Sequence, residues 1–299
     1  MPARSVLSVP WRDRAGRVSG LKLVTFLFAL APGLWLATAY GLDTLGPKPI
    51  TALVHGTGEW AVRFLLLSLA VTPLRRVANY PKLILIRRML GLTVLAYGVF
   101  HLALYVVDQN FILSKVVSEI VSRFYLTIGF VALVGLAILG ITSTDAMIRR
   151  LGKAWPRLHK AVYTIAVLGL FHYFLQAKID VSAPVYWTGL FILLMGWRAM
   201  QRFRVPMNPV TLLGLAIAAA LVTAGVEAAW YGLKSGVPAD AVLGANLEFY
   251  DGLRPAWWVL ITGITLPALN AGRVVMDKLG KTKPAGAANT PGRGAVPAR

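Results

Sequence analysis

The chain contains four histidines, and each falls within or at the end of a long apolar stretch of sequence. A polar, ionisable ring is costly in lipid, so a histidine in such a position is by default a functional candidate. His101 follows Arg87 by 14 residues and His172 follows Leu158 by 14 residues, near the points where two of these stretches begin. At a rise of about 1.5 Å per residue, both rings lie at similar depth in the outer half of the bilayer. Two imidazoles at matched depth on different helices can coordinate one haem iron from opposite faces.

His159 precedes His172 by 13 residues, a rise of roughly 20 Å on one helix, which puts it near the cytoplasmic edge. That separation suits two redox centres stacked across a membrane. At the matching position, the helix of His101 carries Arg87 and Arg88, so these two helices cannot build a second bis-histidine haem. Three interpretations of His159 stay open: a second haem with a non-histidine or exogenous second ligand, a quinone contact, or an interfacial position without a further role.

Two more polar residues lie in the second apolar stretch. Arg63 is near the membrane midplane, where an unpaired charge costs at least a few kcal/mol. Glu59 stands four residues earlier, in the favourable order for an ion pair along a helix. A structural ion pair and a contact with a haem propionate or quinone are equally good interpretations of Arg63. His55 lies near the outer end of the stretch. It could also contact a haem propionate or a quinone, but an interfacial position without a special role is favoured.

Four tyrosines are candidates for lining a haem pocket because they lie near the candidate ligands in the sequence. They are Tyr97, Tyr105, Tyr163 and Tyr173. Glu227, near the outer end of the seventh apolar stretch, is expected to snorkel to the interface.

The segment HGTGEWA satisfies G-x-G-x-x-A through Gly56, Gly58 and Ala61. A dinucleotide-binding fingerprint must follow a strand and open a helix within a βαβ unit, whereas this segment starts an apolar stretch. We therefore reject that interpretation and expect the small residues to allow close helix packing.

Membrane helices must position these residues. The 299-residue chain is 57% hydrophobic and 14% charged, against roughly 25% charged residues in a soluble domain. A membrane-crossing helix needs about 20 mostly apolar residues. The sequence contains such stretches at approximately 21–42, 52–74, 88–107, 123–143, 158–177, 182–200, 209–232 and 256–274. We therefore predict an all-α, polytopic membrane helix bundle.

The charges orient this bundle. The chain has 31 Lys and Arg against 12 Asp and Glu, but the basic residues cluster between apolar runs, so nucleic-acid binding is set aside. If the N-terminus is cytoplasmic, 24 of the 31 basic residues lie on that side, and the positive-inside rule then makes both termini cytoplasmic. Most acidic residues fall on the opposite side, where solvated loop charges are favoured over a specific docking patch. The absence of cysteine excludes disulfides, iron–sulfur clusters, thiolate zinc sites and covalently attached c-type haem.

Several segments together resemble the haem-binding membrane subunit of the bacterial protein-methionine-sulfoxide reductase system, the MsrQ or YedZ family, which belongs with ferric-reductase-like transmembrane domains. They are HGTGEWAVRFLLLSLAVTPLRR (55–76), RRMLGLTVLAYGVFHLALYVVDQN (87–110), RFYLTIG (123–129) and ITSTDAMIRRLGKAWPRLHKAVYTIAVLGLFHYFLQAKID (141–180). The resemblance implies a six-helix haem-binding core, with its haem ligands on His101, His159 and His172 and its second-helix histidine on His55.

The resemblance also implies an inner-membrane b-type cytochrome with one or two haems, and FMN. Such a subunit passes electrons from quinol or a cytosolic flavin reductase to a periplasmic, molybdopterin-containing enzyme that reduces oxidised methionines in proteins. It catalyses no sulfoxide chemistry itself. We expect a basic cytoplasmic N-terminus (1–20), the haem-binding core (21–200), two additional transmembrane helices (201–279) and a disordered cytoplasmic tail (280–299), the last two being a departure from the family pattern.

Three other functions compete with electron transfer to a partner. A stand-alone ferric or quinone reductase would turn over without one. A proton-coupled secondary transporter could use the histidines and Glu227, but such transporters tend to carry broken helices and inverted repeats, and neither is clear in the sequence. A purely structural anchor would leave the matched histidines unexplained.

Overall fold

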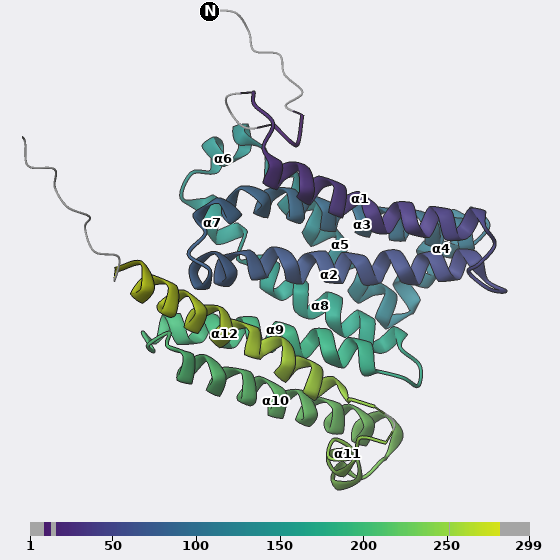
Figure 1. Cartoon of the computed structure of the whole chain (residues 1–299). Coiled ribbons are helices and arrows are strands. Elements are labelled where there is room, and N and C mark those ends of the chain that lie inside the picture. The colour runs from purple at the N-terminus through teal and green to yellow at the C-terminus, as the bar shows by residue number, and fades with distance from the viewer. Residues whose placement is uncertain (1–8, 13–15, 251, 282–299) are drawn as a thin grey trace, which may run out of the picture.

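The computed structural model describes residues 9–12, 16–250 and 252–281, and all regular structure within these ranges is helical (Figure 1). Long helices occupy all eight predicted stretches. They are α1 (Gly20–Gly41), α2 (Pro49–Val77), α3 (Arg87–Asp108), α5 (Phe124–Ile141), α8 (Ala161–Gln176), α9 (Ser182–Arg202), α10 (Pro209–Ser235) and α12 (Pro255–Lys281). The predicted all-α class is confirmed for the described residues.

Five described segments are long and apolar enough to cross a membrane. They are Gly20–Gly41, Pro81–Asp108, Phe124–Ile141, Ala154–Gln176 and Pro209–Ser235. The chain is thus a multi-pass membrane protein. Helix α2 is also long enough, but it carries Glu59 and Arg63 within its span. It packs against α1, α3, α8, α9 and α12, so neighbouring helices rather than lipid surround much of its surface.

Five short elements were not predicted, because a search for stretches of about 20 apolar residues does not detect them. They are the 3₁₀-helix η1 (Pro81–Ile86) and the short helices α4 (Leu113–Ser122), α6 (Asp145–Leu151), α7 (Ala154–Leu158) and α11 (Ala239–Ala245). Helix α12 runs to Lys281, so the first two residues of the predicted tail at 280–299 are helical. The rest of that tail lies outside the described residues, as do 1–8 and 13–15 of the predicted N-terminal segment.

The long helices pack in two groups that share α9. Helices α2 and α3 form one closely packed pair, and α5 and α8 form another; α9 contacts α2 and α8 on one side and α10 and α12 on the other. Glycines allow the second group to approach closely, because a Cβ atom at Gly189 would meet the side chains of Thr223 and Val259. Small residues at helix contacts are typical of membrane bundles.

The two ends of the bundle differ. One end of the bundle holds the beginning of α1, the short helices α6 and α7, and the last turns of α12 (Figure 1). The opposite end holds α4 and α11. The described ends of the chain therefore share one side of the bundle, as the prediction of two cytoplasmic termini requires; the side of the membrane itself stays a prediction.

Glu227 is fully buried near the end of α10. Arg254 donates a hydrogen bond to its carboxylate at 2.7 Å, and Asn246 donates another at 3.1 Å. The expectation that Glu227 snorkels to the interface is therefore wrong: a cation arriving from the loop before α12 compensates the charge inside the protein. This network ties α10 to α11 and α12.

A proline in α1 is accommodated by a side chain from α3. Pro32 lies within α1, and the hydroxyl of Tyr97 inserts beside it, accepting a hydrogen bond from the Gly33 N–H at 2.8 Å and donating one to the Ala29 carbonyl at 2.9 Å. A side chain inserted into the helical ladder is a recognised cause of helix bending. Tyr97 therefore fixes α1 against α3 one turn before His101.

A second proline leaves a backbone carbonyl without its helical donor, and a charged side chain donates to that carbonyl instead. Pro73 in α2 has no N–H, so the Leu69 carbonyl four residues earlier lacks its helical donor. Arg198 of α9 donates to that carbonyl at 2.7 Å, and also to the Leu194 carbonyl and the Tyr163 hydroxyl. A charge within the bundle thus satisfies backbone groups that have no water to bind.

We expect Arg198→Met to lower the free energy of unfolding by about 1.5–3 kcal/mol, the usual size of a hydrogen bond to a charged group. The measurement is thermal unfolding of the purified protein in detergent. Arg202→Met, one turn further along α9 at an exposed position, is the matched control and should leave the midpoint nearly unchanged.

Introducing Pro73→Ala should shrink the cost of Arg198→Met, because the restored N–H gives the Leu69 carbonyl a helical donor. An identical cost of Arg198→Met with Pro73 or Ala at this position would show that the proline is not the reason for the contact.

Candidate haem-binding site

A cavity of about 610 Å³ lies among α2, α3, α5 and α8, with α4 at its outer end. Its size is within the roughly 300–1,000 Å³ usual for ligand sites. The inner part is lined by apolar side chains such as Leu65, Leu136 and Ile165, and the outer part by polar ones such as Asp108 and Gln109. The cavity therefore suits a large, mostly apolar ligand that carries polar groups at one edge.

His101 and His172 face each other across this cavity. Their ring centres are 6.2 Å apart and their planes are nearly perpendicular, at 83°. With metal–nitrogen bonds of about 2.0–2.1 Å, two imidazoles on opposite sides of one metal ion have ring centres about 6 Å apart. The separation of the two rings thus fits axial ligation of a single iron.

Each ring is held by a backbone carbonyl of a neighbouring helix. The Nδ1 atom of His101 lies 2.8 Å from the Val54 carbonyl oxygen, and that of His172 lies 2.8 Å from the Tyr125 carbonyl oxygen. Because a carbonyl oxygen only accepts, both Nδ1 atoms carry the proton. In the neutral imidazole this leaves Nε2 unprotonated, and a metal-ligating histidine has this arrangement.

A glycine stands four residues after each carbonyl. Gly58 follows Val54 in α2, and Gly129 follows Tyr125 in α5. An added Cβ would lie 3.0 Å from Nδ1 of His101 at Gly58, and 2.8 Å from Nδ1 of His172 at Gly129. The rings reach the carbonyls because these positions have no side chain. Gly58 lies inside α2 and packs against the ring of His101. It is therefore not part of a strand-to-helix turn, which agrees with our rejection of a dinucleotide-binding fingerprint.

These residues fit a haem. Two helix pairs each present one imidazole: α2 positions His101 of α3, and α5 positions His172 of α8. The apolar walls match a macrocycle, and the polar outer end matches its carboxylate groups.

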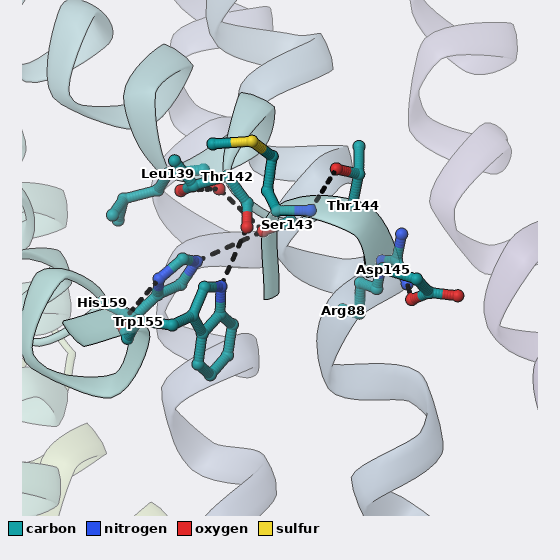
Figure 2. Close-up of polar contacts among 9 residues, drawn as sticks. Arg88, Leu139, Thr142, Ser143, Thr144, Asp145, Trp155 and His159 are labelled. Atoms are coloured by element: carbon teal, nitrogen blue, oxygen red, sulfur yellow. Dashed lines mark hydrogen bonds and ion pairs between the residues drawn. The ribbon is translucent and has the colours of Figure 1, made fainter. Parts of the chain in front are cut away.

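His159 lies away from this cavity, in a two-residue turn between α7 and α8 rather than within one continuous helix. Figure 2 shows its surroundings: the ring stacks on Trp155 with centres 3.9 Å apart, and Nε2 lies 3.3 Å from the Ser143 hydroxyl. Trp155 in turn donates to the Thr142 carbonyl at 2.9 Å. The structure does not bring His159 together with His101 and His172, and its role as a ligand stays a prediction.

The other two residues predicted to contact a propionate or quinone are His55 and Arg63, and only His55 lines the cavity. His55 is exposed and lines the cavity. Arg63 is not among the residues lining it: its guanidinium donates to Glu59 at 2.8 Å and lies over the rings of Trp60 and Trp187. Glu59 itself faces the cavity. The ion pair expected from the i, i+4 spacing is present.

Of the four candidate tyrosines, Tyr105 and Tyr173 line the cavity, whereas Tyr97 braces α1 and Tyr163 accepts a hydrogen bond from Arg198. Tyr97 and Tyr105 both lie four residues from His101, so spacing alone could not separate the two roles.

Sequence reasoning missed a polar network at the outer end of the cavity. Tyr105 of α3 donates to Glu119 of α4, which also accepts from Arg123 at 3.0 Å. Arg123 donates in addition to the Tyr125 hydroxyl at 3.1 Å; this hydrogen bond, together with the charge of Glu119, raises the pKa of Arg123. The i, i+4 spacing of Glu119 and Arg123 was the available signal, but it needs a helix at α4 to be interpreted.

Known proteins resemble this chain. Residues 57–170 match the family described as "Ferric reductase like transmembrane component". A protein-methionine-sulfoxide reductase heme-binding subunit MsrQ from Azospira oryzae is 39% identical over 192 residues, which cover 63% of this chain and 82% of that protein. The subunit of the same name from Xanthomonas campestris pv. campestris is 41% identical over 169 residues, covering 56% of this chain and 78% of the relative. No solved structure matches the chain.

Proposed function

The chain belongs to the MsrQ family of protein-methionine-sulfoxide reductase heme-binding subunits, and from that premise we propose that it binds haem between His101 and His172 and passes electrons to a methionine-sulfoxide reductase. The observation that carries the proposal is the facing pair of imidazoles. Their centres are 6.2 Å apart, and each ring is fixed with Nε2 free to bind.

The ligation favours electron transfer over catalysis at the iron. When bound, haem supplies a one-electron redox centre. His101 and His172 would hold the haem from both sides, so the chain would leave no open position for a substrate. The carbonyls of Val54 and Tyr125 hold the two imidazoles in place. The chain is an electron-transfer subunit, and sulfoxide reduction takes place on its partner.

The asymmetry of the bundle supports a direction of transfer. Residues of α4 line the cavity, and α4 lies at the end of the bundle opposite the described ends of the chain (Figure 1). Basic residues concentrate on the other side, which supports an inner-membrane location with both termini cytoplasmic. The family resemblance supplies the rest of the proposal: the partner is a periplasmic, molybdopterin-containing reductase, and the donor is quinol or a cytosolic flavin reductase. The system would repair oxidised periplasmic proteins.

The b type is carried over from the family resemblance, and it agrees with the absence of cysteine, which excludes a covalently attached c-type haem. Residues 21–200 form the haem-binding core, and 201–279 add two helices that pack on α9. His159 is proposed as the ligand or contact of a second redox group, and FMN is carried over from the family alone. Arg63 acts through Glu59, which lines the cavity, and His55 is the remaining candidate for a quinone or propionate contact.

A transporter is less well supported. Glu227, which proton coupling would use, is fully buried and paired with Arg254 at 2.7 Å, so its charge has a fixed structural partner.

Replacing either facing histidine should remove the haem. We expect His101→Ala and His172→Ala to abolish haem retention, because each imidazole is one of the two side chains that would hold the group. His159→Ala should reduce haem content partially or alter the spectrum. The measurement is a reduced-minus-oxidised visible spectrum, with haem quantified per chain. Equal haem content in the parent and all three variants would refute the assignment.

Electron delivery is tested with the partner present. We expect the chemically reduced haem of the parent, held without oxygen, to be reoxidised when a periplasmic methionine-sulfoxide reductase and a protein containing methionine sulfoxide are both added. Omitting the sulfoxide is the control. Haem that stays reduced with both present, but is oxidised by a ferric chelate, would favour a stand-alone ferric reductase instead.

The glycines should matter in proportion to how closely they approach the rings. Gly129→Ala should lower haem occupancy more than Gly58→Ala, since its added carbon would lie 2.8 Å rather than 3.0 Å from the imidazole nitrogen. Alanine favours a helix over glycine by about 1 kcal/mol, so a general loss of helix stability would not account for the result. Gly91→Ala, which meets nothing within 4 Å, is the control. Parental haem content in Gly129→Ala would contradict the prediction.

A further inference from the structure

The two ends of the cavity differ in polarity, as the two edges of a haem do. A haem joins an apolar macrocycle to two propionate carboxylates, and burying those carboxylates among apolar side chains would be costly. The inner wall is formed by residues such as Leu65, Leu136 and Ile165, and the polar groups gather beneath α4. The propionate edge therefore belongs at the outer end.

Helix α4 lies over that end in a defined orientation. Leu113, Val117 and Val121 follow one another at four-residue intervals and are exposed, as expected of an amphipathic helix lying in the membrane interface. Lys115 and Glu119 are also four residues apart, on a different side of the helix, and both line the cavity. Glu119 fixes the helix through Tyr105.

Most charges at this end already have partners. Glu119 is bound by Arg123 and Tyr105. Asp108 accepts hydrogen bonds from Thr51 at 3.0 Å and from Gln109 at 3.2 Å. Lys115 makes no hydrogen bond or ion pair with any residue that the structure describes, and it is exposed. It is the lysine of the cavity wall whose ammonium group is free to bind an anion.

Resting on the haem site proposed above, we propose that Lys115 binds a haem propionate and so fixes the haem with its carboxylate edge beneath α4. This is the contact that the sequence suggested for Arg63, whose guanidinium is instead engaged by Glu59. Lys115 is a positioning residue: it contacts the periphery of the haem and leaves the ligation to His101 and His172.

The test compares haem with haem dimethyl ester, in which both propionates are neutral. Each is loaded into the apoprotein, and its loss to excess apomyoglobin is followed. The parent should lose the ester faster than haem. Lys115→Gln should lose haem about two- to fivefold faster than the parent, the range for an exposed ion pair, while its loss of the ester changes little. The ratio between the two rates should therefore shrink.

Lys178→Gln is the matched control, because Lys178 is an exposed lysine just beyond cavity-lining Ala177. It should keep the parental ratio, and Lys115→Arg should restore most of it. A parental ratio in Lys115→Gln would overturn the proposal while the six-coordinate spectrum still supported the haem site. A parent that gave that spectrum with neither compound would instead overturn the proposed function.

Discussion

Each facing imidazole is held by a hydrogen bond from Nδ1 to a helix carbonyl, and the geometry of the cavity depends on these two bonds. They determine which nitrogen is free, set the direction in which it points, and leave the rings 6.2 Å apart. A glycine four residues after each carbonyl makes room for the ring. The same local solution occurs on α2 and on α5, so two helix pairs present two equivalent ligands from opposite sides.

Rigid helix pairs are needed to keep such a site in place without water. In a bilayer, a backbone group freed by a proline must find a partner within the protein. Arg198 donates to the Leu69 carbonyl that Pro73 leaves without a helical donor, and the Tyr97 hydroxyl bridges the Gly33 N–H and the Ala29 carbonyl beside Pro32. Both side chains come from another helix, so each proline adds a link between helices. Arg198, a charge that a hydropathy search counts against α9, is part of this bracing.

The sequence was sufficient for the helices and for the histidine pair because both depend on simple periodicity. Apolar length predicts a membrane helix, and equal distances from two basic clusters predict equal depth. Helix α4 was missed because its signal is amphipathic and short. The carbonyl partners of the histidines and the burial of Glu227 depend on residues far apart in the chain, such as Val54 with His101 and Glu227 with Arg254. Only the packed structure brings these together.

The position of the cavity also bears on the electron donor. Its inner wall is apolar, and His159 lies beyond it, in the turn before α8, surrounded by Trp155 and Ser143. Under the proposed function, electrons from a cytosolic flavin reductase would cross this inner half, where a second redox centre near His159 would shorten the step. A quinol dissolved in the bilayer could instead approach the exposed His55 on the cavity wall and needs no such relay. Under the proposed function, a single haem between His101 and His172 would therefore suit quinol, and a second redox centre near His159 would suit the flavin reductase.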